Sequence, residues 1–231
     1  MTAVSEIIGE ALIYIDDVRM QEQLSSNPAL FYRRTSAYVT ASMPLLSSPP
    51  ELYSHVSRNY VAPEFADSEW VSTADSTIDS ETDVSTGCIG YDICSVTIRS
   101  EDGMYAIPYT EAAYNAETGV VTFPKQASEG IEYEIDFYKD GTANDLTLHQ
   151  KRLWALAISI VWNERFSNDW LNLQPKIKDS SFNTVNESNF MDKLTNRMIA
   201  NRQAFEDELH KYEQLNAYRN INMPYGHRSL I

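Results

Sequence analysis

The first 22 residues carry their apolar positions at the period of a helix. These positions recur at intervals of three, one, three, one, three and three: Val4, Ile7, Ile8, Ala11, Leu12, Ile15 and Val18. The spacing places them on one stripe of an amphipathic helix. Asn27 and Pro28 then combine a capping residue with one that fits a first helical turn, so a second helix is expected to begin there. Pro44 limits that helix, and a short helix is expected over residues 51–58.

Helical character returns after Thr142. Asn144 or Asp145 is expected to cap a helix that runs from Leu146 to about Phe166. Within it, residues 153–162 (LWALAISIVW) are apolar nearly all round. This pattern predicts a central helix with neighbours on several sides.

The last long helix is expected to start near Thr184, because Thr184 and Glu187 have the spacing of a capping box. Its expected buried stripe comprises Phe190, Leu194, Met198, Phe205, Leu209 and Tyr212. The helix is expected to end at about Arg219, which gives a length of roughly 50 Å. Long helices usually pack within their own chain, and this is the favoured interpretation. Contact with another subunit is the alternative.

Between about Asn59 and Gly141 the helical period disappears. Turn signals such as SEDG, NAETG, SEG and KDG separate strand-like segments in this region. The expected strands are Ile93–Arg99, Met104–Pro108, Val120–Phe123 and Ile131–Tyr138. NAETG followed by VVTF predicts a hairpin whose first strand ends at Tyr114. The stretch 70–87 is rich in Ser, Thr and Asp and is expected to be largely loop.

The last of these strands alternates apolar and acidic residues. Glu132, Glu134 and Asp136 share one face of a strand, about 6.6–7 Å apart. Such spacing also fits the carboxylate pair of an inverting glycosidase, but a catalytic acid needs burial or a close carboxylate to raise its pKa. Clean alternation instead predicts a solvated acidic face. Catalysis, a calcium site and an interface remain alternatives.

The order of elements is helices, then strands, then helices. It predicts an α+β fold, in which a helical bundle formed by both chain ends (residues 1–58 and 142–219) carries an inserted antiparallel β-module (residues 59–141). Residues 220–231 have no period and are expected to form an extended C-terminal tail.

Charge and composition narrow the function classes. The formal net charge is −15 over 231 residues, and no Lys/Arg run appears, which argues against phosphate binding. Fourteen tyrosines suit half-buried positions and subunit interfaces. No signal peptide is visible and no apolar run is long enough to span a bilayer, so a soluble protein, intracellular at synthesis, is expected.

Motifs for chemistry are weak. Asp140, Asn144 and Asp145 in KDGTANDL resemble a calcium loop only loosely, and a turn with a helix cap is the favoured interpretation. The four histidines are isolated in sequence. Cys88 and Cys94 are expected to be free buried thiols, with a disulfide as the alternative. We therefore predict no catalytic residue, no cofactor and no metal ligand.

Two stretches carry a resemblance to a known family. YNAETGVVTFPKQASEGIEYEIDFYKDGT is followed by LHQKRLWALAISIVWNERFSNDWLN. With the order of elements, this text resembles the head–tail adaptor (connector, or neck) proteins of tailed bacteriophages. Those proteins pair an N-terminal helical hairpin with C-terminal helices and an inserted β-rich region. The stretch 70–87 has no counterpart in that pattern.

The resemblance implies a structural virion protein rather than an enzyme. It would form a ring, usually of twelve copies, between the portal protein and the next neck or tail protein. It would be made in the host cytoplasm and reside at the head–tail interface. DNA would only pass through the lumen of the ring, and the protein would not bind a membrane. The residues expected to bind the portal or a neighbouring subunit lie in the tail: Asn220, Ile221, Met223, Pro224, Tyr225, His227, Arg228, Leu230 and Ile231.

Three alternatives accompany this interpretation. The chain could serve as another neck or tail component, such as a tail terminator, a stopper or an appendage anchor. It could also be a carbohydrate-binding or hydrolytic module centred on the β-region. That module would need a concave site with aromatic residues and at least one carboxylate of raised pKa. The third alternative is a helical interaction protein of a cell.

Overall fold

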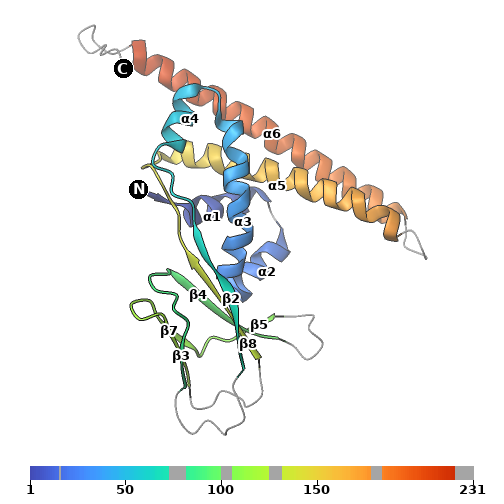
Figure 1. Cartoon of the computed structure of the whole chain (residues 1–231). Coiled ribbons are helices and arrows are strands. Elements are labelled where there is room, and N and C mark those ends of the chain that lie inside the picture. Colours follow the sequence, from blue (N-terminus) through green and yellow to red (C-terminus); the bar gives the residue numbers. More distant parts are fainter. Residues whose placement is uncertain (16, 73–81, 100–105, 125–131, 178–183, 222–231) are drawn as a thin grey trace. The chain divides into compact units, whose positions relative to one another are not determined.

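The structure is a computed structural model that describes the chain except for residues 16, 73–81, 100–105, 125–131, 178–183 and 222–231 (Figure 1). It is an α+β fold of helices and antiparallel sheets, as the sequence predicts. The chain forms two compact units. The sheet unit comprises Met1–Ile8, Asp16–Ala37 and Asn59–Ala143, and the helical unit comprises Gly9–Ile15, Tyr38–Arg58 and Asn144–Ile231.

The helices follow the predicted stripes with one exception: the single helix expected over residues 4–18 ends at Ile15, and Val18 begins a second helix. They are α1 (Val4–Ile15), α2 (Val18–Ser26), α3 (Pro28–Ser42), α4 (Pro50–Ser57), α5 (Leu148–Ile177) and α6 (Thr184–Ile221), with a 3-10 turn η1 over Met43–Leu46. The predicted starts of α3 at Pro28 and of α6 at Thr184 are confirmed. The predicted end of α5 near Phe166 is wrong, because the helix continues to Ile177.

Two sheets make up most of the sheet unit. The four-stranded sheet has the order β2-β8-β4-β5, with β2 over Glu64–Ser72, β8 over Glu132–Lys139, β4 over Ile93–Arg99 and β5 over Ala106–Pro108. The three-stranded sheet has the order β3-β7-β6, with β3 over Thr82–Ser85, β7 over Val120–Phe123 and β6 over Ala113–Asn115. A short pair joins β1 (Thr2–Ala3) to β9 (Thr142–Ala143). All pairs are antiparallel, and the predicted hairpin is β6–β7.

The predicted loop at residues 70–87 is wrong at both ends. Strand β2 extends to Ser72 and pairs with β8, and β3 pairs with β7. Residues 73–81 lie outside the described part of the chain. A polar composition indicates exposure to solvent but does not exclude a strand, and these strands pair with partners at least 35 residues away along the chain.

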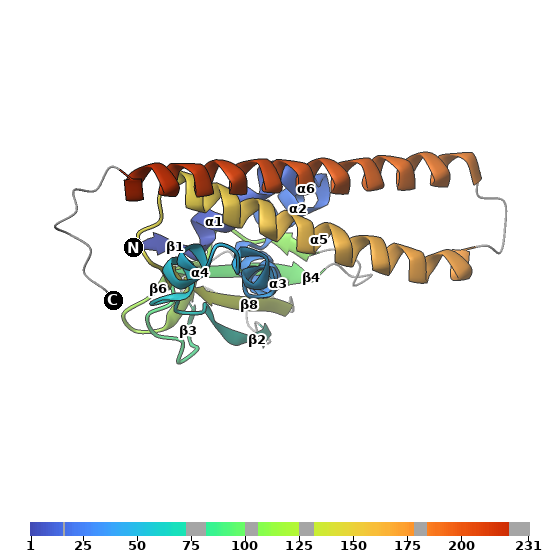
Figure 2. The same cartoon turned by 90° about the horizontal axis from the view of Figure 1, so that it is seen from above.

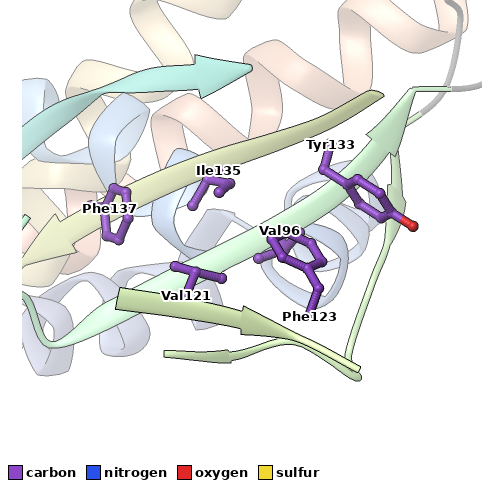
Figure 3. Close-up of a cluster of buried hydrophobic side chains, with 6 residues drawn as sticks. All are labelled: Val96, Val121, Phe123, Tyr133, Ile135 and Phe137. Atoms are coloured by element: carbon purple, nitrogen blue, oxygen red, sulfur yellow. The ribbon is translucent and has the colours of Figure 1, made fainter. Parts of the chain in front are cut away.

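The core of the sheet unit lies between the two sheets. One face of β8 and β4 contributes Tyr133, Ile135, Phe137 and Val96, and β7 contributes Val121 and Phe123 (Figure 3). All six are at most 8% exposed. The predicted burial of the apolar face of residues 131–138 is therefore confirmed for its described side chains.

In the helical unit, α5 and α6 lie side by side as an antiparallel pair (Figures 1 and 2). Residues Leu153–Ile160 of α5 are all buried, as expected for a central helix. The indole Nε1 of Trp154 donates to Ser42 Oγ at 3.0 Å, which ties α5 to the end of α3.

Gly141 permits a close backbone approach in the sheet unit. A Cβ at this position would lie 2.5 Å from the carbonyl oxygen of Val61 and 2.8 Å from Pro63 Cδ. Gly141 also accepts a hydrogen bond from the backbone N–H of Val4 at 3.0 Å. Strand β9 and the start of α1 therefore meet where a side chain does not fit.

We expect Gly141→Ala to lower the free energy of unfolding by about 1–3 kcal/mol, because the backbone must shift to admit the methyl group. Gly9→Ala is the matched control, since a Cβ at Gly9 meets nothing within 4 Å in the exposed middle of α1. That control should be more stable by about 0.5–1 kcal/mol. Urea unfolding followed by circular dichroism measures both, and equal effects of the two variants would contradict the steric argument.

Candidate functional site

The acidic face of β8 is not the solvated surface that the alternation predicts. Asp136 is 1% exposed and Glu134 is half-buried; the side chain of Glu132 lies outside the described residues. The prediction fails because β8 lies between β2 and β4, and the start of α3 covers this face at Asp136. The alternation of apolar and acidic residues separates the two faces of a strand, but it does not show that the acidic face is exposed to solvent.

Asp136 is held by the residue that caps α3. Asn27 Nδ2 donates to Asp136 Oδ2 at 2.7 Å, and Asn27 Oδ1 accepts from the backbone N–H of Leu30 at 3.0 Å. On the adjacent strand, Ser95 Oγ accepts from the backbone N–H of Ala29 at 3.0 Å. A carboxylate close to a helix N-terminus is favoured by the helix dipole. This network therefore fixes the start of α3 on the sheet.

Asp140 fixes the start of α1 in a similar way. Its carboxylate accepts from the backbone N–H of Ser5 at 3.1 Å, from the Ser5 hydroxyl, and from Tyr138 Oη at 2.8 Å. Burial, and then the hydrogen bond to Asp140, raise the pKa of Tyr138 well above its ordinary value. The predicted turn at Asp140 is thus also a cap for a remote helix.

The predicted caps of α5 are wrong. The helix begins at Leu148, and Thr147 and Gln150 form the capping box: Thr147 N–H donates to Gln150 Oε1 at 2.9 Å, and Gln150 N–H donates to Thr147 Oγ1 at 3.3 Å. Asn144 instead donates to the carbonyl oxygen of His55 at 2.7 Å. Thr-x-x-Gln was readable in the sequence, three residues beyond the favoured Asn144.

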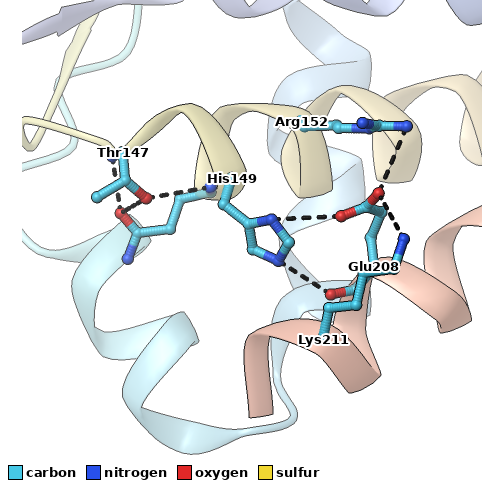
Figure 4. Close-up of polar contacts among 6 residues, drawn as sticks. Thr147, His149, Arg152, Glu208 and Lys211 are labelled. Carbon is cyan, nitrogen blue, oxygen red and sulfur yellow. Dashed lines mark hydrogen bonds and ion pairs between the residues drawn. The ribbon is translucent and has the colours of Figure 1, made fainter. Parts of the chain in front are cut away.

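Glu208 is a buried carboxylate in the seam between α5 and α6 (Figure 4). It lies 3.3 Å from His149 Nδ1, 3.4 Å from an Arg152 guanidinium nitrogen and 3.3 Å from Lys211 Nζ. The other ring nitrogen of His149 lies 3.1 Å from the Glu208 carbonyl oxygen. The basic side chains of His149, Arg152 and Lys211 thus converge on one acid.

Asn201 is a second polar residue in the same seam. Its Nδ2 donates to Ser159 Oγ at 3.2 Å and to the carbonyl oxygen of Tyr14 at 3.3 Å. The predicted apolar stripe stepped from Met198 to Phe205 and missed both Asn201 and Glu208. The step of seven was the available signal for Asn201, because a helical stripe needs an intermediate residue three or four positions on. Glu208 lies three residues after Phe205, where the stripe already had Leu209.

Asn163, in α5, is fully buried, and neither atom of its amide has a hydrogen-bond partner among the described residues. Ser159 of α5 faces Asn201 of α6. Because the two helices are antiparallel, Asn163, one turn after Ser159, is level with Arg197, one turn before Asn201. Arg197 donates to the Ile15 carbonyl oxygen at 2.9 Å.

Large apolar side chains remain exposed on the same helix pair. Leu148 at the start of α5 is 77% exposed, and Leu215 and Tyr218 near the end of α6 are 57% and 66% exposed. Ile199 of α6 is 50% exposed. Leu215 and Tyr218 are three residues apart and therefore neighbours on one side of α6.

The remaining predicted residues are dispersed. Cys88 and Cys94 are free and half-buried, and burial raises the pKa of Cys94 to about 12, so this thiol stays protonated at neutral pH. His210 pairs with Glu213 at 3.5 Å and His149 with Glu208, so the structure does not bring these two histidines together.

Most residues of the predicted tail lie outside the described part of the chain. Asn220 and Ile221 are the last residues of α6, so the helix ends two residues later than predicted. The others, at positions 222–231, stay a prediction: Met223, Pro224, Tyr225, His227, Arg228, Leu230 and Ile231.

A cavity of about 480 Å³ lies in the sheet unit. Its lining combines aromatic residues, Tyr109 and Tyr114, with hydroxyl groups and the carboxylate of Asp92. Nothing in the sequence pointed to it, because its walls come from four separate segments of the chain.

Comparisons with family models, with curated proteins and with solved structures found no match for this chain. No helix in the described part of the chain is both long and apolar enough to cross a membrane.

We expect Asn27→Ala to lower the free energy of unfolding by about 2–4 kcal/mol, because it removes a helix cap and a donor to a buried carboxylate. Asn27→Asp keeps an oxygen for the Leu30 N–H but sets a second carboxylate beside Asp136, and should cost more at neutral pH. Asn115→Ala is the control: its Oδ1 also accepts backbone N–H groups, but in an exposed turn. Thermal and urea unfolding test the order Asn115→Ala, Asn27→Ala, Asn27→Asp.

Glu208→Ala should lower the free energy of unfolding by about 1–3 kcal/mol, since three basic side chains lose their shared partner. Glu213→Ala removes an exposed acid paired with His210 and should change it by less than about 0.5 kcal/mol. Chemical denaturation of both variants measures the difference. Indistinguishable values would show that the buried contacts of Glu208 contribute nothing to stability.

Proposed function

We propose that this chain is a structural virion protein without enzymatic activity, a head–tail adaptor of a tailed phage. In this proposal its copies form a ring, of about twelve by analogy with the family it resembles, that joins the portal to the neck or tail. The proposal keeps an inserted module over residues 59–141 and a docking tail beyond the end of α6. Of the bundle expected over 1–58 and 142–219, the helical unit takes residues 9–15, 38–58 and those from 144 onward, whereas residues 1–8 and 16–37 belong to the sheet unit.

The observation that carries the proposal is the α5–α6 pair. Its interior register is fixed by Asn201 and Glu208, while Leu148, Leu215 and Tyr218 stay exposed. Exposed large apolar side chains that lie together commonly mark protein–protein contacts. An α6 helix of 38 residues, about 57 Å long, offers enough length for side-by-side contact with other copies.

A closed ring needs a heterologous contact, in which one surface of each copy meets a different surface of the next. The apolar end of the α5–α6 pair would supply one of these surfaces. The formal net charge of −15 favours a ring that repels DNA phosphates and lets the genome pass without binding.

The test is co-expression of the full chain with the portal protein of the same phage, followed by native mass spectrometry and electron microscopy. We expect rings on the portal, and we expect Leu215→Glu with Tyr218→Glu to abolish them while the monomer stays folded by circular dichroism. Gln214→Glu with Ala217→Glu, two exposed neighbours that gain the same charge, should still assemble. A chain that stays monomeric beside intact portal rings would overturn the proposal.

A further inference from the structure

The cavity of the sheet unit lies beside the upstream half of β4. One edge of β4 pairs with β8 along its length. On the other edge, β5 pairs with Thr97–Arg99 and Tyr109 N–H donates to the Val96 carbonyl oxygen at 2.8 Å, so Ile93–Ser95 border the cavity on this edge among the described strands. The end of α2 forms a second wall with Ser25 and Ser26, and the end of β5 with the segment after it forms a third, with Pro108 and Thr110. The volume, about 480 Å³, falls in the range of small-ligand sites.

The polar side chains of the cavity lining carry hydroxyls, the thiol of Cys94 and one carboxylate, and none of the lining residues is Lys, Arg or His. Asp92 Oδ2 accepts from the backbone N–H of Asp140 at 2.8 Å, and Oδ1 has no partner among the described residues. The Thr110 hydroxyl likewise has none there. Ser25 and Ser26 donate to carbonyls of their own helix, so their oxygens can still accept.

The apolar part of the lining is held in place by the core of the sheet unit. The Tyr109 ring stacks on Phe123 with centroids 6.1 Å apart and packs edge-on against Tyr133 at 5.1 Å. Val96 and Val121, both buried, contribute to the same lining. The cavity therefore presents a fixed aromatic and aliphatic surface beside groups that accept and donate hydrogen bonds.

We propose that this cavity binds a neutral saccharide. Hydroxyl groups that both donate and accept, with one carboxylate, match the hydroxyls of a sugar, and the apolar lining suits its C–H faces. Anionic ligands are disfavoured, because no cation lines the cavity and the protein is acidic. An ammonium ligand would bind through its charge to the single carboxylate, Asp92, and its affinity would therefore fall as the salt concentration rises.

This site differs from the one that the acidic strand offered. Asp136 is committed to Asn27 and is not in the cavity lining. The inference does not rest on ring formation, because all the lining residues belong to the sheet unit and none belongs to the α5–α6 pair.

The experiment is a printed glycan array probed with the full chain, followed by calorimetric titration of the best neutral saccharide at low and high salt. Asp92→Asn keeps an acceptor for the Asp140 N–H but removes the charge, and Thr110→Val removes one hydroxyl at constant shape. We expect each to weaken binding about tenfold, the loss of roughly one hydrogen bond, with little effect of salt. Glu117→Gln and Thr118→Val, exposed in the β6–β7 turn, are the controls and should bind like the parent.

Three results would overturn the inference. The first is no binding to any glycan on the array. The second is binding only to charged glycans, with affinity that falls steeply as salt rises. The third is saccharide binding that Asp92→Asn and Thr110→Val leave unchanged, which would place the site elsewhere. Urea unfolding of both variants separates loss of the site from loss of the fold.

Discussion

The hydrogen bond between Asn27 and the buried carboxylate of Asp136 is the contact on which the sheet unit depends. A buried carboxylate costs several kcal/mol unless donors satisfy it. The same asparagine caps α3 through its other amide atom, so the helix start and the central strand determine each other's position. Ser95 on the adjacent strand receives the N–H of Ala29 and adds a second link between α3 and the sheet. A register shift of one residue in β8 would turn Asp136 into the apolar core.

The helical unit uses the same physical device in a different setting. A seam that is entirely apolar allows two long helices to slide, whereas a buried polar residue that must find its partner selects one register. Asn201 against Ser159 and Glu208 against His149 do this about two turns apart along α6. Asn163, in α5, does not select the register in this way, because its buried amide has no partner among the described residues.

Local patterns predicted those features that local physics determines. The stripe of residues 4–18, the Asn27–Pro28 start and the Thr184 capping box each rest on neighbours within a few positions, and the helices begin as expected. The strands at Ile93–Arg99 and Val120–Phe123 could also be predicted from local sequence, since turn signals flank them. What the sequence could not give is which face another segment covers: Asp136 looks like a surface acid until α3 lies on it. Strand β3 was missed for the same reason, because three of its four residues are polar and only its distant partner makes it a strand. Strand β2 mixes apolar Phe65, Trp70 and Val71 with acidic residues without a clean alternation.

Neither candidate surface was readable from the sequence. Leu215 lies three residues after Tyr212 of the predicted stripe and seven after the buried Glu208, so periodicity alone would bury it, whereas it is 57% exposed. The cavity beside β4 follows from no pattern, because α2, β4, the segment after β5 and β7 each supply part of it. The two surfaces share no residue and belong to different units. A substitution that impairs assembly at Leu215 therefore has no direct route to Asp92, and each proposal can fail without the other.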